Sequence, residues 1–514
     1  MSLRITRKSE FMRSVTDRPG EGREALLTRI LVPGLLLCLV LSIACEVRAQ
    51  PFQEEWTPVF NLSDSSGSAQ YSAITVDRAG NLHVVWVDRE DPAGELGESP
   101  TGSALFYARW DGEGWTTPHD VLAGGIFNRV VLGLNPVDDS LHAIWSAWPN
   151  LRHSSAYVAG RPEYPAAWSM PTEIQDVAAE GGTAPDIAIA SDGTIHVVWV
   201  ARPLVNTPSE VLYSHSTDNG MTWSHSIALS GTPEESINPR VAVGLEGEVY
   251  AVWEEGTSPD VGTVIHYTRS RDGGRTWDPP RRLNDYSAGY VNISVSPDGR
   301  VIVSWVILDA GISRRGRELI VSADGGDSWT GPVAFPHGDA YGYSYRPAEV
   351  AFDSMGRAHF LFFDYEAEQF GLFHIMWTGN EWGSGIRIAD VRQLEHVRAR
   401  IAITRGNQVH AIWAGGASQN TYQIYTSRSQ TDAPAIPSEP VKSVPIPSPV
   451  ATPTLTVTAV PSPSPTRQAE TMPVPSVAKV VSRPDPNTSI IVGIIASGVL
   501  IGLVIFVQRV RSRM

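Results

Sequence analysis

The stretch APDIAIASDGTIHVVWV, residues 184–200, with VLYSHSTDNGMTW, residues 211–223, is the clearest copy of the pattern that determines the fold. Residues 185–190 alternate between apolar and polar side chains, which predicts a strand with one buried face. Residues 191–194 read as a tight turn in which Gly193 supplies a positive φ. Residues 195–200 are almost continuously apolar, as in a strand covered on both faces. A third strand, a second turn and a short outer strand ending at Ser230 complete a four-stranded unit.

The second strand of this unit ends in His-x-x-Trp or a close variant, and it recurs seven times at intervals of 51 to 59 residues. A repeat of this length, made only of strands and turns, predicts a β-propeller with four antiparallel strands in each blade. The count favours seven blades. Six is the alternative, if the irregular repeat at residues 128–174 is not a full blade. The seven copies are His83/Trp86, His142/Trp145, His196/Trp199, Tyr250/Trp253, Ile302/Trp305, His359/Phe362 and His410/Trp413.

The two ends of the repeat region are complementary. The seventh repeat, residues 398–428, has three strands and then stops, whereas residues 55–62 look like the Trp-x-x-Pro outer strand of the other blades. We therefore expect the N-terminal strand to complete the last blade and close the ring. Closure removes the open sheet edges on which β-proteins aggregate.

Three turns, at residues 216–223, 270–277 and 322–329, read Ser-x-Asp-x-Gly-x-Thr/Ser-Trp. This pattern resembles the Asp-box, or BNR repeat, of sialidase-like propellers, and the resemblance covers about residues 51–430. The resemblance implies that these boxes lie at the periphery, away from any active site. Their carboxylates are expected to accept backbone hydrogen bonds within their own turns, and their tryptophans to pack between blades. The residues concerned are Asp218, Asp272, Asp324, Trp223, Trp277 and Trp329.

The inner strand of each blade begins at the central channel, where propellers form pockets. Counting ten residues back from each histidine position gives a polar ring that could hold an anionic sugar or a peptide end. The alternative is a water-filled channel whose charges cancel in pairs. The ring consists of Ala73, Asp186, Arg240, Asn292, Glu349 and Arg400, with Arg129 or Val130 in the second blade.

For a true sialidase, the resemblance implies three arginines on the substrate carboxylate, a Tyr nucleophile with a Glu base, and an Asp acid. The Arg-Ile-Pro signature of that family's first blade is absent, because residues 69–74 read AQYSAI. No catalytic residue is therefore assigned. The candidates for the arginine set are Arg240, Arg346 and Arg400, with Glu254, Tyr343, Tyr345 and Asp364 as candidate companions.

Outside the propeller, at residues 50–432, the sequence predicts four further segments. Residues 1–49 read as a secretory signal peptide, with an uncleaved N-terminal anchor as the alternative. Residues 433–488, rich in Pro, Ser and Thr, are expected to form a disordered stalk. Residues 489–507 read as one transmembrane helix and residues 508–514 as a basic cytoplasmic tail. This layout predicts a single-pass type I protein of the cell membrane with its propeller outside the cytoplasm.

The amino-acid composition argues against several kinds of partner and site. The formal net charge of −15 argues against nucleic-acid binding. Both cysteines, Cys38 and Cys45, fall in the signal region, so no disulfide is expected in the exported domain. No cofactor motif is present, and one histidine per blade is too widely spaced for a metal site, so neither a cofactor nor a metal is expected.

Three functions remain open. The favoured one is a surface propeller that binds a glycan or a protein without chemistry. The second is a divergent sialidase-like glycoside hydrolase, and the third is a structural component without a ligand pocket. The sequence does not give the oligomeric state.

Overall fold

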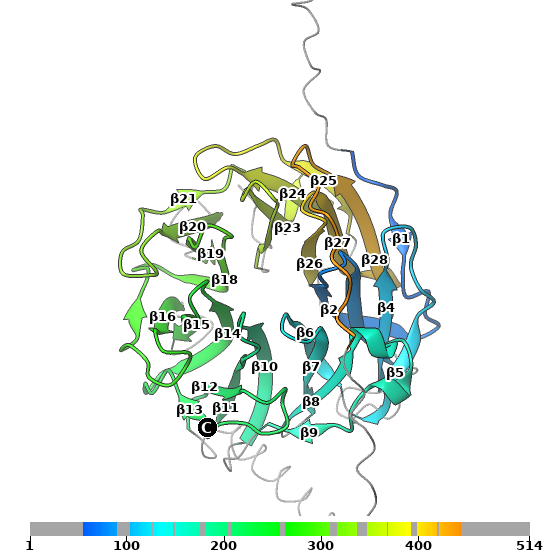
Figure 1. The fold of residues 1–514 in the computed structure, drawn as a ribbon. Coiled ribbons are helices and arrows are strands. Elements are labelled where there is room, and N and C mark those ends of the chain that lie inside the picture. The colour runs from blue at the N-terminus through cyan, green and yellow to red at the C-terminus, as the bar shows by residue number, and fades with distance from the viewer. Residues whose placement is uncertain are drawn as a thin grey trace, which may run out of the picture. The chain divides into compact units, whose positions relative to one another are not determined.

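The computed structural model describes residues 55–89, 103–125, 127–147, 150–174, 180–202, 207–256, 263–308, 316–336, 347–366, 369–391, 398–418 and 421–443. These residues form seven four-stranded antiparallel sheets arranged as a ring (Figure 1). The predicted seven-bladed propeller is thereby confirmed. The six-bladed alternative is wrong, because the irregular repeat at residues 128–174 forms a complete sheet of its own.

Each blade is built from consecutive strands, and only the last takes its outer strand from the start of the chain. Two short 3-10 helices, η1 (Val158–Gly160) and η2 (Pro165–Ala167), lie in the second blade. The first three blades are β2 (Ser68–Val76), β3 (Leu82–Arg89), β4 (Ser103–Trp110), β5 (His119–Gly125); β6 (Asn128–Asn135), β7 (Ser140–Ala147), β8 (Asn150–Tyr157), β9 (Thr172–Glu173); and β10 (Glu180–Ile189), β11 (Ile195–Arg202), β12 (Glu210–Ser216), β13 (Ile227–Ala228). The next three are β14 (Glu235–Val243), β15 (Val249–Gly256), β16 (Val264–Ser270), β17 (Arg281–Arg282); β18 (Ala288–Val295), β19 (Val301–Ile307), β20 (Arg317–Ser322), β21 (Val333–Ala334); and β22 (Glu349–Phe352), β23 (Ala358–Glu366), β24 (Gln369–Trp377), β25 (Ile386–Asp390). The seventh blade is β26 (Ala399–Thr404), β27 (Gln408–Ser418), β28 (Thr421–Gln430) and β1 (Phe60–Asn61).

The N-terminal strand closes the ring as predicted. Phe60 pairs with Thr426 and Asn61 with Tyr425, so β1 becomes the outer strand of the seventh blade. Trp56 then takes the place of the tryptophan that opens the outer strand in the other blades, and its ring lies 5.3 Å from that of His374 in the sixth blade.

Seven buried clusters hold the ring together, and each is shared by two neighbouring blades. Trp86, Trp199 and Trp253, all from the His-x-x-Trp strands, are completely buried within these clusters. Because every blade contributes to two clusters, the apolar burial that stabilises the fold is distributed around the whole ring.

The inner histidines belong to this framework. His83 bonds Asp77, and His359 bonds Asp353, through Nε2 at 3.2 and 3.3 Å, so these strand histidines are bonded to the turns that precede their strands. The turn itself also forms as predicted, with Gly193 at a φ of 89°. In the irregular second blade, Asp139 adopts the left-handed conformation instead, with a φ of 56°.

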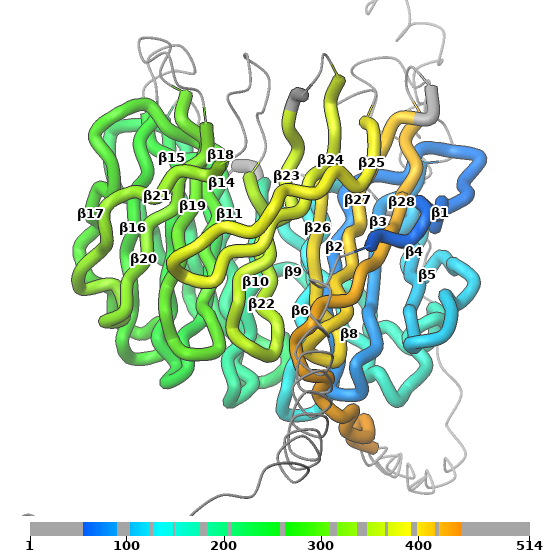
Figure 2. Tube along the Cα trace, turned by 90° about the horizontal axis from the view of Figure 1, so that it is seen from above, coloured from blue at the N-terminus to red at the C-terminus, as the bar shows by residue number. Residues whose placement is uncertain are grey.

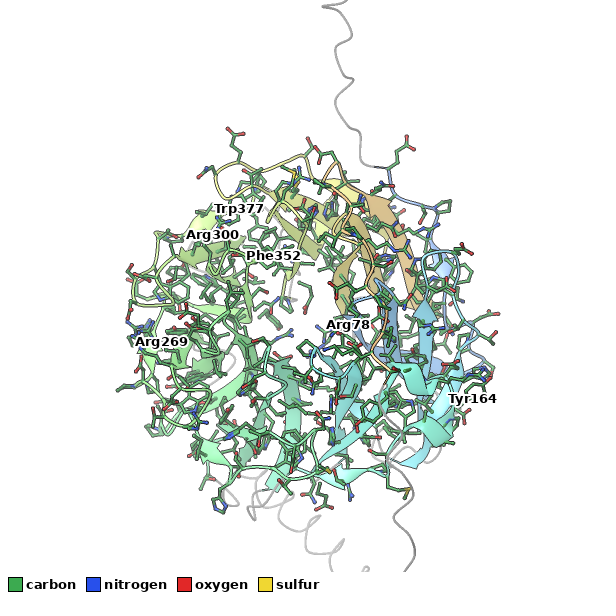
Figure 3. The ribbon with its side chains drawn as sticks, in the orientation of Figure 1. Arg78, Tyr164, Arg269, Arg300, Phe352 and Trp377 are labelled. Carbon is green, nitrogen blue, oxygen red and sulfur yellow. The ribbon has the colours of Figure 1, made fainter. Side chains whose placement is uncertain are left out.

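A segment after the last strand, residues 431–443, lies against the turns that follow the inner strands; we call it the strap. In Figure 2 it runs along the lower edge of the ring. Arg78, labelled in Figure 3, contacts Glu439 of the strap twice: its carbonyl accepts a hydrogen bond from the backbone amide of Glu439, and its Nη1 lies 3.5 Å from the Glu439 carboxylate. The Pro-rich composition begins at residue 433, but the propeller still holds the chain up to residue 442. The strap contacts are Arg357–Asp432, Ile436–Arg405, Glu439–Arg78 and Lys442–Asp139.

The predicted signal peptide, most of the stalk, the transmembrane segment at 489–507 and the tail at 508–514 lie outside the described residues. Within the described ranges, no helix is long and apolar enough to cross a membrane.

Candidate functional site

The inner strand of each of the first five blades carries a bulge near its start, where the pairing register shifts. At each bulge a residue other than glycine has a positive φ, which costs about 1–3 kcal/mol per residue. Bulges redirect side chains and are frequent beside functional sites. The same strained conformation therefore occurs five times around one channel, and this makes that end of the ring the candidate functional site. The residues are Tyr71 (54°), Arg129 (45°), Ala184 (51°), Asn238 (50°) and Tyr290 (55°).

Two rings of residues follow from these bulges. The mouth ring consists of the five bulge residues together with Pro347 and Arg398, which hold the corresponding positions in the last two blades. The inner ring lies two residues further along each strand, and it reproduces the ring expected from the sequence. In the second blade the inner-ring residue is Val131 instead of the expected Arg129 or Val130, because the turn between β6 and β7 is only one residue longer than the equivalent turn of the other blades. Its members are Ala73, Val131, Asp186, Arg240, Asn292, Glu349 and Arg400.

The inner ring neutralises its own charges. Oε1 of Glu349 lies 3.0 Å from Nη2 of Arg240 and 2.7 Å from Nη1 of Arg400. Asp186 is 3.8 Å from Arg240 and accepts a hydrogen bond from the backbone of Val241. Burial raises the pKa of Glu349, but Arg400 and Arg240 more than offset this effect and hold it below its usual range. Two arginines against two carboxylates leave little net charge at this level.

The mouth ring differs from the inner ring in its balance of positive and negative charges. It surrounds a cavity of about 280 Å³ that Arg240 and Glu254 also line. Within the described part of the chain, no carboxylate forms an ion pair with Arg398. Burial, followed by the positive charges of Arg240, Arg129 and Arg400, lowers the pKa of Arg398 well below its usual range. A guanidinium in such surroundings gains stability from a nearby anion. The cavity is therefore suited to a negatively charged ligand.

Glu254 is the carboxylate of this cavity. It follows Trp253 on β15 and is buried, with 3% of its surface exposed. Its Oε1 accepts hydrogen bonds from the backbone of Tyr290 at 2.6 Å and from Nδ2 of Asn238 at 3.1 Å. Burial dominates over these bonds and raises the pKa of Glu254 to about 7. A carboxyl group with this pKa can give or take a proton at neutral pH.

The structure brings together most of the residues expected at the site. Asp186, Arg240, Asn292, Glu349 and Arg400 surround one channel. Asn292 is used structurally, because its Nδ2 donates to the carbonyl of Ala348 at 2.9 Å. Of the remaining candidates, Arg346, Tyr343 and Tyr345 lie outside the described residues, and Asp364 is buried away from the cavity lining.

Sequence reasoning missed the mouth ring, above all Arg398, Tyr71 and Tyr290. The bulges give no signature in the sequence, because tyrosine, arginine, alanine and asparagine all occupy them. Once the inner ring had been placed, stepping back two residues along each strand would have found every member.

The Asp-boxes have the predicted local role. Asp272 accepts hydrogen bonds from the backbone and hydroxyl of Thr276 at 2.8 and 2.7 Å, and these bonds lower its pKa to about 2. Asp218 and Asp324 make the equivalent bonds to Thr222 and Ser328. The box tryptophans pack on the preceding blade: the rings of Trp277 and Tyr213, for example, are 4.8 Å apart.

This ring of seven sheets with Asp-box turns defines a class of protein, the Asp-box β-propellers. The family model for the BNR repeat-like domain matches residues 104–355. Over these residues the propeller therefore matches the BNR repeat-like family, in agreement with its Asp-box turns.

Several solved structures are similar in fold. A protein of unknown function from Dyadobacter fermentans is 15% identical over 73% of this chain and 99% of its own, with a TM-score of 0.47. An ulvan lyase is 10% identical over 71% of this chain and 95% of its own, with a TM-score of 0.48. The intramolecular trans-sialidase of Ruminococcus gnavus is 12% identical over 75% of this chain and 99% of its own, with a TM-score of 0.41. No curated protein matches the chain in sequence.

Proposed function

We propose that the propeller binds an anionic glycan through a carboxylate or sulfate group held in the mouth cavity. The observation that carries this proposal is the unbalanced charge of the mouth ring. The carboxylates of the inner ring are already paired with Arg240 and Arg400, whereas Arg398, which forms no ion pair with a described carboxylate, brings further positive charge to the same cavity. Guanidinium groups bind carboxylate and sulfate oxygens with two parallel hydrogen bonds.

The rest of the lining suits a sugar ring. Tyr71 and Tyr290 supply aromatic surface, and Asn238 supplies an amide beside Glu254. Ligand sites commonly combine such apolar surface with a few fixed polar groups. A volume of about 280 Å³ fits one acidic sugar unit, so we propose recognition of a terminal or exposed acidic residue of a longer glycan.

The proposal places this binding outside the cell on a membrane anchor. It is supported by the signal-like residues 1–49, the Pro-rich residues 433–488 and the uncharged apolar segment within 489–507. Binding to a surface protein through an acidic peptide end would use the same cavity.

A second candidate function, a divergent sialidase-like glycoside hydrolase, is favoured by one observation. Glu254, whose pKa is about 7, lines the cavity beside Arg240, and Tyr290 lies next to it. A proton donor in an arginine-lined pocket is a requirement for hydrolysing an acidic glycoside.

Both candidates are tested by titrating the protein with glucuronate, sialic acid and sulfated monosaccharides, and by following product release from their glycosides. We expect binding that Arg398→Gln weakens at least tenfold, while Arg152→Gln, an exposed arginine of β8, leaves it unchanged. Turnover that Glu254→Gln abolishes would establish the hydrolase instead. Absence of binding to every acidic sugar and acidic peptide would contradict both candidates.

A further inference from the structure

One position on the third strand of each blade faces the tryptophan of the next blade; we call it the seam position. In five blades an aromatic ring fills it, and that ring packs on Trp168, Trp223, Trp277, Trp329 or Trp56 at centroid distances of 4.8 to 6.4 Å. The fifth blade uses Leu319, assisted by Phe335. The seventh blade has the much smaller Thr426, which pairs with Ile412 as the others pair with their second strands. The five aromatic residues are Tyr107, His153, Tyr213, Tyr267 and His374.

In four of these blades the aromatic side chain at the seam position also makes a hydrogen bond. Its hydroxyl or Nε2 bonds Nδ1 of the inner histidine of the same blade, at distances of 2.7 to 3.0 Å. Tyr213 and His196 form one such pair, at 2.8 Å. Nδ1 of the inner histidine therefore has a hydrogen-bond partner on the side that faces the next blade.

The seventh blade lacks this partner. Its inner histidine, His410, bonds Thr404 through Nε2 at 2.9 Å and is 1% exposed. Among the described residues, nothing bonds its Nδ1. A polar atom that borders a cavity and has no protein partner can make a hydrogen bond to a suitable ligand atom.

A cavity of about 370 Å³ lies at this point, between the seventh and first blades; we call it the seam niche. Trp110 and Trp115 form an aromatic wall, and the guanidinium of Arg428 lies 4.2 Å from the ring of Trp110. His410 supplies the polar group. The lining consists of Thr57, Phe60, Trp110, Trp115, His410, Thr426, Ser427 and Arg428.

We propose that the seam niche is a binding site for a phenol-type ring, with the ring against Trp110 and Trp115 and the hydroxyl on Nδ1 of His410. The protein itself defines this ligand chemistry, because Tyr107 and Tyr213 place a phenol at the equivalent position of their own blades. The site is separate from the mouth cavity, with which it shares no lining residue.

The pattern of charges supports a neutral imidazole as the acceptor. Burial, together with the positive charge of Arg428, lowers the pKa of His410 to about 3. The ring therefore stays unprotonated at neutral pH. With its proton on Nε2 towards Thr404, it offers the Nδ1 lone pair to a hydroxyl donor.

The test uses 4-methylphenol and the full chain, with binding followed by saturation-transfer NMR and calorimetry. We expect saturable binding at one site. Thr426→Tyr fills the niche from within, so it should weaken binding at least tenfold and raise the melting temperature. Thr426→Ser, which leaves the niche open, should keep the wild-type affinity.

A matched variant creates the same niche elsewhere. Tyr213→Thr removes a phenol next to His196, so it should lower the melting temperature, add a second 4-methylphenol site and regain stability when the ligand is added. The proposal is overturned if the wild-type chain shows no saturable binding, or if Thr426→Tyr leaves the affinity unchanged. Both of these results can be read even if Tyr213→Thr does not fold.

Discussion

The Glu349→Gln variant tests the coupled charges of the inner ring. In the wild type, one carboxylate oxygen serves both Arg240 and Arg400, and all three side chains are 11 to 14% exposed. The substitution keeps the shape of the side chain but leaves the two neighbouring guanidinium groups without the carboxylate that they share, while Asp186 stays at 3.8 Å from Arg240. Removing one partner of a buried ion pair costs about 3–5 kcal/mol. Because the glutamine oxygen still accepts one hydrogen bond, we expect a loss of about 3 kcal/mol in the free energy of unfolding.

Urea unfolding followed by tryptophan fluorescence measures this loss. The matched control is Glu173→Gln, which breaks the exposed Arg152–Glu173 pair, 2.7 Å long with side chains 37 and 44% exposed, and should cost less than about 1 kcal/mol. Because the pKa of Glu349 is lowered in the folded state, its stabilising effect should be present above the ordinary pKa of a glutamate and should disappear as the pH falls through the folded-state value. Equal losses in the two variants would refute the interpretation of the inner ring as a coupled charge network.

Four further predictions concern Asp272, Glu254 and Asp139. Asp272→Ala removes exposed turn hydrogen bonds and should lower the free energy of unfolding by about 1 kcal/mol; the difference from wild type, measured by urea unfolding, should vanish only as the pH falls from about 4 towards 2. Glu254 ionises as the pH rises through about 7, so the affinity for an anionic sugar, measured by calorimetry, should decrease over this range and become independent of pH in Glu254→Gln. The raised pKa of Glu254 also means that the free energy of unfolding should fall as the pH rises from about 4.5 to 7, and that Glu254→Gln should remove this slope. Asp139→Ala removes both the acceptor of the Lys442 amide and the buried partner of Arg78, so it should speed limited proteolysis within residues 433–443 and also lower the melting temperature of the ring.

The sequence predicted the blades well because their signals are local. A turn, an apolar strand and a tryptophan at fixed spacing recur in every unit, and even the incomplete ends at Trp56 and Arg428 indicated how the ring closes. The same counting located Asp186, Arg240, Glu349 and Arg400 correctly, because the paired strands between each of these residues and the histidine position are regular and their turns have the same length.

The predictions from the sequence were less accurate where backbone irregularity or tertiary packing determines which residues line the channel. The length of the turn between β6 and β7 makes Val131 the second-blade member of the inner ring, and the residues with the positive φ values that define the mouth ring are not of one type. Arg398 gains its significance only from the neighbouring arginines that surround it in the fold. The significance of Thr426 becomes evident only when it is compared with the six larger side chains at the seam position of the other blades.

The strap has a mechanical consequence. Its bonds run from Arg357 and Arg405 in the last two blades to Arg78 and Asp139 in the first two, so it crosses the joint that β1 closes. A force that pulls on the chain beyond residue 443 first meets the bond between Lys442 and Asp139 in the second blade. The pull must peel the strap away, contact by contact, before it reaches β28. Tension is thus kept from the pairing of Phe60 with Thr426, and the propeller can stay closed while the chain beyond residue 443 is pulled.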